Sequence, residues 1–205
     1  MNMAQFFYYV QDAPWYSHFL QPVLQTLHPL QTSARVLDVG TGAGKLLELG
    51  KSKTSFQWEG ADTDDEMLSE ARKRISLQDV PLHLLSPNKL PFESASFDAV
   101  TFCSVLFLIP TPLPLLEEAA RVLHPNGRLV TLTPTGEGNI TPEVIRQIGL
   151  NPKNWTFFLW RQMTSGNGRA WAQKEVLAQF AHQKNAIYKK QTVFKGLAIV
   201  EWIQF

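Results

Sequence analysis

The sequence lacks cysteine pairs, long apolar runs and an excess of charge of one sign. Its one cysteine, Cys103, excludes an intrachain disulfide and a metal centre built from several thiolates. No apolar run approaches the roughly 20 residues that cross a membrane, and the first residues lack the charged segment and apolar core of a signal peptide. A net charge of +1 gives no general basic surface for nucleic acid. We therefore expect a cytoplasmic protein with no membrane span, no metal and no nucleic-acid partner.

The stretch 36–48 carries an apolar strand, a glycine-rich turn and the start of a helix. Gly40, Gly42 and Gly44 leave the backbone bare where a Cβ would block a ligand or forbid the dihedral angles. The helix N-terminus that follows has unpaired N–H groups and a partial positive charge. We interpret the stretch as a site where amides exposed by the glycines face a nucleoside-type ligand. A merely tight strand–helix turn is the alternative.

The spacing of the glycines separates three kinds of nucleotide site. A phosphate-binding P-loop needs a glycine five positions before the Gly-Lys pair and Ser or Thr after it, but this chain has Val39 and Leu46 there. The dinucleotide fingerprint needs a third glycine three positions after the second, and that position is Lys45. The remaining pattern is Asp-x-Gly-x-Gly-x-Gly, from Asp38 to Gly44.

A second strand is predicted at 56–61, and it ends at Asp62. A carboxylate in this position, roughly 20 residues past the turn, can accept hydrogen bonds from both hydroxyls of a ribose. The acids that follow are expected to cap the next helix, 66–76, because negative charge is favoured in a first helical turn; they are Asp64, Asp65 and Glu66. Three bases of that helix are expected on a solvated surface: Arg72, Lys73 and Arg74.

Strands and helices continue to alternate up to residue 135. Further strands are predicted at 81–85, 96–104 and 128–133, with a helix at 115–123. This rhythm predicts an α/β fold, a mainly parallel sheet with helices on both faces.

Four blocks of sequence in this order resemble a known family. They are 36–44 (VLDVGTGAG), 60–68 (GADTDDEML), 90–100 (LPF and SFDAV) and 118–129 (EAARVLHPNGRL). Together they resemble the class I S-adenosylmethionine (SAM)-dependent methyltransferases, in particular the small stand-alone type related to the ubiquinone/menaquinone C-methyltransferases. The resemblance covers residues 34–135 and implies a Rossmann-like, doubly wound sheet of seven strands, whose antiparallel last strand lies next to the fifth.

The resemblance also implies SAM as cofactor and a set of binding residues. The glycines would line its methionine and ribose side, Asp62 would hold the ribose, and the residues after the third and fourth strands would border the adenine and the methyl group. The full set is Asp38, Gly40, Thr41, Gly42, Gly44, Asp62, Thr63, Ser86, Pro87, Asn88, Cys103 and Ser104. Ser86 departs from the pattern, because many relatives carry an acid there to accept a hydrogen bond from adenine.

The two ends of the chain have weaker patterns. Residues 1–34 are aromatic and nearly uncharged, which suggests a helical lid over the cofactor or an aromatic helix packed on the domain. Beyond residue 135 we predict a helix at 141–148, a strand at 155–160, a turn at 165–168, a helix at 171–183 and a last strand at 192–205. Candidate acceptor contacts are Trp15, Tyr16, His18 and Glu137.

We therefore expect one domain, 1–205, with a lid (1–34), a cofactor-binding core (35–135) and a C-terminal part (136–205) that contains a helical excursion at about 162–191. The predicted function is in-line methyl transfer from SAM to a small, apolar or aromatic acceptor, by a monomer or homodimer. Alignment of donor and acceptor supplies most of the rate in such a displacement, so no catalytic residue is assigned. A non-catalytic SAM-binding or regulatory protein, an RNA or protein methyltransferase and, more distantly, an NAD-linked oxidoreductase are the alternatives.

Overall fold

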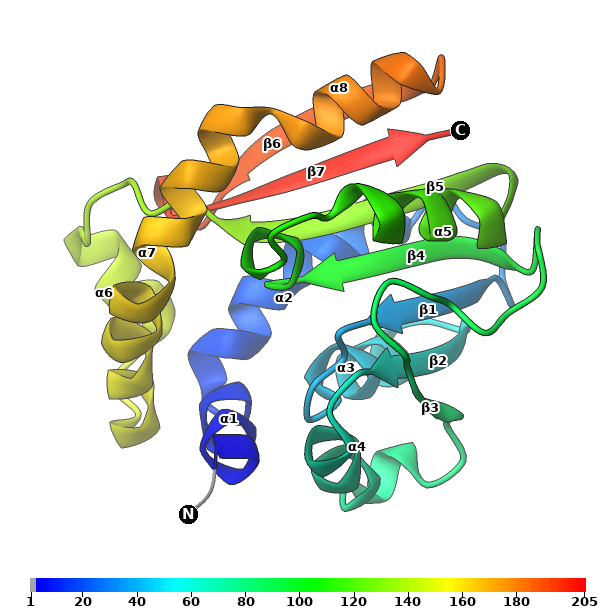
Figure 1. Ribbon diagram of the computed structural model, residues 1–205. Coiled ribbons are helices and arrows are strands. Elements are labelled where there is room, and N and C mark those ends of the chain that lie inside the picture. The colour runs from blue at the N-terminus through cyan, green and yellow to red at the C-terminus, as the bar shows by residue number, and fades with distance from the viewer. Residues whose placement is uncertain (1–2) are drawn as a thin grey trace.

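The computed structural model describes residues 3–205, which form one mixed sheet covered by helices (Figure 1). Its strand order is β3-β2-β1-β4-β5-β7-β6. The first five strands pair in parallel, whereas β7 pairs antiparallel with both β5 and β6. The strands are β1 (Arg35–Val39), β2 (Gln57–Asp62), β3 (Leu82–Leu84), β4 (Phe97–Cys103), β5 (Leu123–Pro134), β6 (Ile187–Val193) and β7 (Ala198–Gln204). The predicted fold class is confirmed, including the antiparallel last strand beside the fifth.

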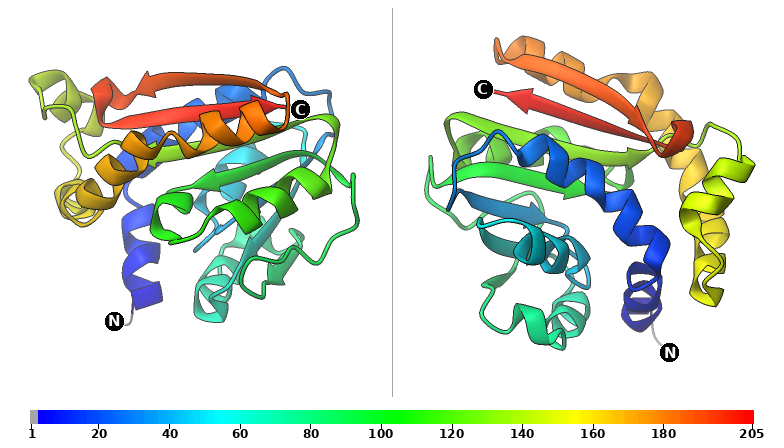
Figure 2. Two further views of the ribbon diagram at one scale, coloured as in Figure 1. Left: turned by 45° about the horizontal axis from the view of Figure 1, so that its top comes forward. Right: turned by 180° about the vertical axis from the view of Figure 1, so that it is seen from behind.

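Helices cover both faces of the sheet, as the front and back views show (Figures 1 and 2). The α-helices are α1 (Met3–Gln11), α2 (Pro14–Leu27), α3 (Lys45–Lys53), α4 (Asp65–Arg72), α5 (Leu113–Val122), α6 (Pro142–Ile148), α7 (Thr156–Lys174) and α8 (Val176–Gln183). Short 3₁₀ turns are η1 (Ile75–Leu77), η2 (Leu106–Leu108), η3 (Pro152–Trp155) and η4 (Phe194–Gly196). Within residues 3–205, no helix has both the length and the apolar character needed to cross a membrane.

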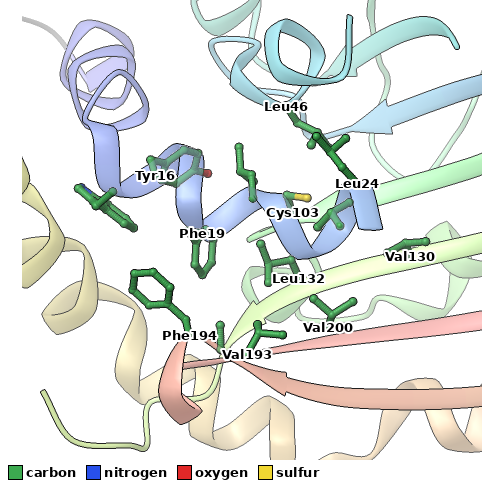
Figure 3. Close-up of a cluster of buried hydrophobic side chains, with 14 of the residues drawn as sticks. Tyr16, Phe19, Leu24, Leu46, Cys103, Val130, Leu132, Val193, Phe194 and Val200 are labelled. Atoms are coloured by element: carbon green, nitrogen blue, oxygen red, sulfur yellow. The ribbon is translucent and has the colours of Figure 1, made fainter. Parts of the chain in front are cut away.

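The strands supply alternate residues to two hydrophobic clusters. Val36 and Val130 belong to the cluster under α2 and α3, and their neighbours Leu37 and Leu129 belong to the cluster under α5 and α8. This follows from the period of two along a strand in a sheet that is buried on both faces. Figure 3 shows Phe19 of α2 among the side chains that cover the first face.

The strand predicted at 155–160 and the turn predicted at 165–168 are wrong, because 156–160 and 165–168 lie within α7 and Trp155 ends η3. Aromatic residues favour strands on average, but the buried residues here, Phe157 and Trp160, are three apart, so they share one face of a helix. Gly168 does not end the helix. A Cβ there would lie 2.1 Å from the carbonyl oxygen of Pro134, so glycine lets α7 approach the end of β5.

The end of the chain also differs from its prediction. The helix predicted at 171–183 is interrupted at Glu175, whose φ of 46° separates α7 from α8. The last strand of the prediction, 192–205, is replaced by two strands, β6 and β7, with η4 between them. The helical excursion therefore lies between β5 and β6, not between the last two strands. β6 was missed because most of its side chains are exposed at the sheet edge, Lys189 and Lys190 among them.

The start of α6 agrees with its prediction, and the end of α4 differs. The predicted helix at 141–148 is α6, with Thr141 Oγ1 accepting a hydrogen bond from the Val144 amide (3.4 Å) and Pro142 at its first position. The helix predicted at 66–76 is shorter, since α4 ends at Arg72.

Candidate functional site

A cavity of about 630 Å³ lies at the carboxyl ends of β1, β2 and β4, the edge where open α/β sheets bind their ligands. Its volume is that of a typical small-molecule site. The structure brings most of the predicted cofactor residues together in its wall: Gly40, Gly42, Asp62, Thr63, Ser86, Pro87, Asn88, Cys103 and Ser104.

The turn after β1 requires glycine for two reasons. Gly40 has φ of +72° and Gly42 has φ of +56°, which L-residues with side chains rarely adopt. A Cβ on Gly40 would also lie 2.3 Å from Cγ2 of Val105. The bare backbone therefore leaves room for the segment after β4 and for a ligand above the turn.

The amides of the three glycines are not free, so the prediction that they face a ligand is wrong. The N–H groups of Gly40 and Thr41 donate to the Ala61 carbonyl oxygen (2.8 and 3.1 Å), and the Gly44 amide donates to the Thr41 carbonyl (3.0 Å). The Gly42 amide donates to the Asp62 carboxylate (2.8 Å). These bonds tie the turn to the end of β2, so the glycines offer a ligand space rather than their own amides.

Asp62 is held rigidly at the end of β2. Its Oδ2 accepts the bond from Gly42, and its Oδ1 accepts one from the Asp64 amide (3.0 Å). Burial raises the pKa of Asp62, and the two backbone bonds act in the opposite direction. Each carboxylate oxygen keeps a further lone pair for a ligand hydroxyl. Asp64 is the N-cap of α4, as predicted for the acids after Asp62, and its side chain accepts from the amides of Glu66 and Met67.

Three predicted residues lie outside the wall of the main cavity. Gly44 packs beneath α4, where a Cβ would lie 2.5 Å from Cδ1 of Leu77. Asp38 and Thr41 line a second, polar cavity of about 10 Å³, which has room for about one water molecule. Asp38 is buried, and burial raises its pKa to about 7 although the Thr101 hydroxyl donates to it (2.7 Å).

The opposite wall of the cavity is apolar. It is formed by α1, by the segment after β4 and by α7, and its residues include Phe6, Phe7, Val10, Val105, Phe107, Leu108, Ile109, Trp160 and Met163. Sequence reasoning did not identify them individually. The aromatic character of 1–34 was a signal for Phe6 and Phe7, but Trp160 and Met163 were hidden by the wrong assignment of α7. Among the described residues of the wall, only Asp62 carries a formal charge.

Of the four candidate acceptor residues, the structure places Tyr16 in the wall and the other three elsewhere. Trp15 is fully buried, and its Nε1 donates to Oγ1 of Thr156 (2.9 Å). His18 and Glu137 are exposed. The acceptor role predicted for these three is therefore corrected. α2 is part of the hydrophobic core, and α1 is the N-terminal helix that covers the cavity.

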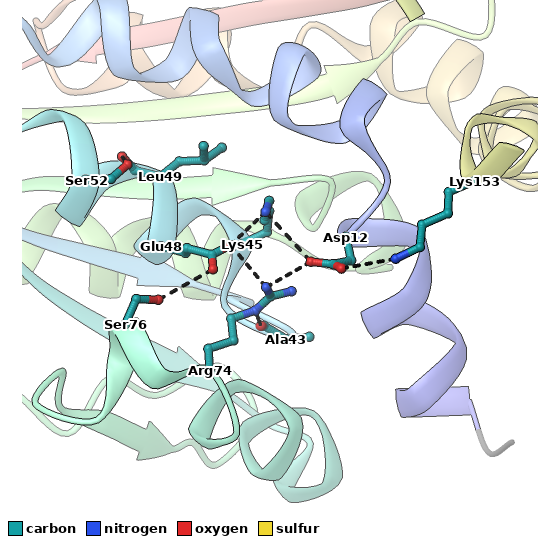
Figure 4. A network of polar contacts seen from close by, with 9 residues as sticks. All are labelled: Asp12, Ala43, Lys45, Glu48, Leu49, Ser52, Arg74, Ser76 and Lys153. Atoms are coloured by element: carbon teal, nitrogen blue, oxygen red, sulfur yellow. Dashed lines mark hydrogen bonds and ion pairs between the residues drawn. The ribbon is translucent and has the colours of Figure 1, made fainter. Parts of the chain in front are cut away.

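Arg74 is buried, so its predicted place on a solvated surface is wrong; its side chain is 3% exposed. Its Nε donates to the Ala43 carbonyl (2.6 Å), and its Nη1 donates to Glu48 (3.0 Å) and Asp12 (3.3 Å). Lys153 of η3 pairs with the other oxygen of Asp12 (3.4 Å). Figure 4 shows Asp12, at the end of α1, between the glycine turn on one side and η3 on the other.

Comparison with known proteins agrees with this geometry. Residues 37–131 match the family model described as "Methyltransferase domain". The chain is 38% identical over 115 residues to the ubiquinone/menaquinone biosynthesis C-methyltransferase UbiE of Desulfotalea psychrophila, covering 55% of this chain and 47% of that protein. It is 34% identical over 160 residues to a demethylmenaquinone methyltransferase of Mycobacterium sp. (strain KMS), covering 71% of this chain and 64% of that protein. The chain thus spans less than half of the first relative (47%) and less than two thirds of the second (64%).

Solved structures share the fold at lower identity. A putative S-adenosyl-L-methionine-dependent methyltransferase of Methanococcus maripaludis has a TM-score of 0.68 at 19% identity, over 96% of this chain and 90% of that one. The plantazolicin methyltransferase BpumL, solved with a substrate analogue and SAH, has a TM-score of 0.70 at 14% identity, over 98% and 89%. The family resemblance inferred from the sequence is confirmed.

Proposed function

Because residues 37–131 match the methyltransferase domain family, we propose that this chain transfers the methyl group of SAM to a small, apolar or aromatic acceptor. The observation that supports this proposal is the division of one cavity into two ends. One end presents the fixed carboxylate of Asp62 above a glycine turn. The other end is a wall of aromatic and aliphatic side chains.

The polar end fits an adenosyl group. Asp62 would accept hydrogen bonds from ribose hydroxyls with the lone pairs that Gly42 and Asp64 leave free. Thr63, Ser86, Pro87 and Asn88 line the same end and would border the adenine. Gln11 lies above Gly42, and its Oε1 is buried without a hydrogen-bond partner. It is therefore suited to accept a hydrogen bond from a polar group of the cofactor.

The bound cofactor supplies a methyl group that is already activated on a sulfonium. The protein contributes alignment and exclusion of water, which can account for effective molarities of about 10⁵–10⁸ M. Burial raises the pKa of both Tyr16 and Cys103, so these two residues in the wall are neutral near pH 7 and do not act as bases. None of the described residues in the wall is His, Lys, Arg or Glu. Asp62, the one charged residue described in the wall, lies at the polar end, so an acceptor that is nucleophilic without prior deprotonation fits this site best.

An electron-rich aromatic ring, such as a hydroquinone, meets these requirements. Its faces would pack against aromatic and aliphatic side chains, and its hydroxyls make the ring carbon nucleophilic. Attack by that carbon would form the new C–C bond as the S–CH3 bond breaks and SAH leaves, and the ring carbon would then lose its proton to solvent. The names of the two relatives described above, which refer to quinone methylation, support the same class. We propose demethylated hydroquinones as the first acceptors to test.

The test has two stages. Calorimetry with SAH and NAD side by side should give binding of SAH and none of NAD, because the turn lacks the dinucleotide spacing. Transfer of a labelled methyl group is then measured with a short-chain demethyl-naphthohydroquinone, a charged amine and a structured RNA. Transfer to the hydroquinone supports the proposal. Binding of SAH without transfer to any acceptor indicates a SAM-binding protein that is not an enzyme, and preference for RNA indicates a nucleic-acid methyltransferase.

A further inference from the structure

Large apolar side chains are exposed in the loop after α6, on η3 and in the first half of α7. Leu150 is 94% exposed, Trp155 53%, Met163 50% and Phe158 47%. We call these four residues the apolar patch. Single exposed apolar residues are common on proteins, but a group of them on neighbouring elements indicates an interaction surface.

The patch follows the geometry of α7. Trp155, the last residue of η3, and Phe158 are three residues apart and lie on the outer side of this segment. Met163 is five residues after Phe158, so it is turned by about 140° around α7 and reaches the cavity wall. Phe157 and Trp160 are on the inner side, where both are buried in the core. The first half of α7 therefore has apolar residues on both its inner and its outer sides, whereas an ordinary surface helix is apolar on its inner side only.

The segment that carries the patch is basic. Between residues 140 and 174 there is one acidic residue, Glu143, against five basic ones, which gives a net charge of +4 where the whole chain has +1. The basic residues are Arg146, Lys153, Arg161, Arg169 and Lys174. Lys153 is already paired with Asp12, whereas Arg146, Arg169 and Lys174 are exposed.

The patch adjoins the mouth of the cavity. Met163 belongs to the patch and also lines the apolar wall. Leu108 of η2 lines the same wall and is 58% exposed, and α7 packs against η2. A molecule that leaves an apolar phase beside the patch therefore meets the apolar end of the cavity at Met163 and Leu108.

We propose that this face docks on the surface of an anionic lipid bilayer, with the apolar patch at the level of the headgroups and the basic residues against anionic lipids. Basic charge combined with Trp, Phe and Leu on one surface is typical of interfacial binding, and tryptophan favours the interface itself. A second copy of this chain is a poorer occupant, because a two-fold contact would bring the same net +4 segment against itself. The docking goes beyond the proposed function, and it gives a lipid-soluble acceptor a direct path to the cavity.

Flotation of the full chain with vesicles tests this proposal. Vesicles of phosphatidylcholine alone are compared with vesicles in which about a third of the lipid is phosphatidylglycerol. We expect the protein to float with the anionic vesicles at low salt and to be released as salt is raised. Failure to bind anionic vesicles, or equal binding to both compositions at all salt concentrations, overturns the proposal.

Variants locate the surface. The double substitution Trp155→Ser and Phe158→Ser should lower partition into anionic vesicles more than tenfold, and Arg146→Glu with Lys174→Glu should lower it about fivefold or more for each charge. The matched control is Leu84→Ser with Ile187→Ser, which removes two apolar residues of similar exposure (56% and 61%) from the two edge strands and should leave partition unchanged. Equal losses in the control and the patch variant contradict the proposal.

Two further measurements separate the possible outcomes. A dimer in light scattering that the patch variant converts to monomer would show that a second copy covers the face, and would overturn membrane docking. Calorimetry with SAH on the same variants should give unchanged affinity, because the patch lies at the other end of the cavity from Asp62. Loss of vesicle binding with retained SAH binding therefore tests docking independently of the methyl-transfer proposal.

Discussion

The cavity has a polar end and an apolar end, and the chain builds them in different ways. The polar end comes from the turns after neighbouring parallel strands, and it is fixed by hydrogen bonds from backbone amides, such as that from Gly42 to the Asp62 carboxylate. The apolar end is assembled from α1, η2 and α7, which are far apart in the sequence. The polar end depends on backbone geometry that few sequences allow. The apolar end depends on packing that many combinations of apolar residues satisfy.

The two ends should therefore differ in how well they tolerate substitutions. A ligand held by Asp62 and the glycine turn depends on positions that tolerate few substitutions. A ligand at the apolar end depends on shape and apolar area, so changes there should alter acceptor choice and leave cofactor binding intact. The following four predictions test this separation, from the largest expected effect to the smallest.

Replacing Asp38 by Asn should remove a pH dependence of stability that arises from the buried Asp38 carboxyl beside the polar end. Burial raises the pKa of Asp38 from 3.8 to about 7, so the folded state binds a proton more tightly than the unfolded state. Stability from this group is then full below about pH 4 and falls as pH rises to 7. Relative to wild type, the Asn variant should gain about 4 kcal/mol of unfolding free energy between pH 4 and pH 8.

Urea unfolding of the cofactor-free protein across this pH range measures the effect. The control is Tyr16→Phe at the boundary with the apolar end. Burial raises the pKa of Tyr16 above the range tested, so this variant should shift stability by a constant amount at all pH values. A pH slope that Asp38→Asn leaves unchanged would show that the buried carboxyl does not titrate in this range.

Replacing Arg74 by Met should show how strongly the glycine turn at the polar end and α1 at the apolar end stabilise each other. Arg74 joins the glycine turn, through Ala43 and Glu48, to Asp12 at the end of α1. Its guanidinium also lies over the Tyr8 ring, 4.5 Å from the centroid. Because the substitution leaves buried partners unpaired, we expect a loss of about 3 kcal/mol in unfolding free energy.

The exposed neighbour provides the control for this change. Arg72→Met removes an arginine whose side chain is 51% exposed and whose ion pair with Asp65 is 3.5 Å long, so its effect should be below about 0.5 kcal/mol. Hydrogen exchange should increase in α1 in the Arg74 variant and remain unchanged in β4. Similar losses for both substitutions would mean that Arg74 does not tie α1 to the turn.

The same contrast explains what could be predicted from the sequence. The strand–turn–helix pattern around Gly40 and the carboxylate after β2 are local signals, and both are where they were predicted. α7 was misassigned because its aromatic run favours a strand, and only contact with the sheet decides which residues are buried. Arg74 was placed on the surface because its distant partner Asp12, 62 positions earlier, has no sequence pattern that pairs them. The exposed amides were predicted from the glycines, but Ala61 and Asp62 of the next strand occupy them.

Replacing Asp62 by Ala should weaken SAH binding about 100-fold, since bonds to a charged acceptor contribute about 1.5–3 kcal/mol each. Part of the loss comes from the Gly42 and Asp64 amides, which lose their acceptor. Asp62→Asn keeps one acceptor oxygen and should bind with intermediate affinity. Asp65→Ala, which changes an exposed acid three positions later, should bind SAH as wild type does. Calorimetry on the three variants decides whether the polar end holds the cofactor, and unchanged affinity in Asp62→Ala would contradict this assignment.

Replacing Met163 by Asp should affect the acceptor alone. Met163 lines the apolar wall near its mouth and is half exposed, so the protein should fold with the carboxylate in place. An apolar acceptor then meets a charge at the rim, and we expect its KM to rise about tenfold, or about 1.4 kcal/mol, with SAH affinity unchanged. Met163→Leu keeps the apolar contact and should keep the wild-type KM. If the Asp variant weakened SAH binding as strongly as acceptor binding, the two ends would be one site, because a change confined to the apolar wall would have reached the cofactor.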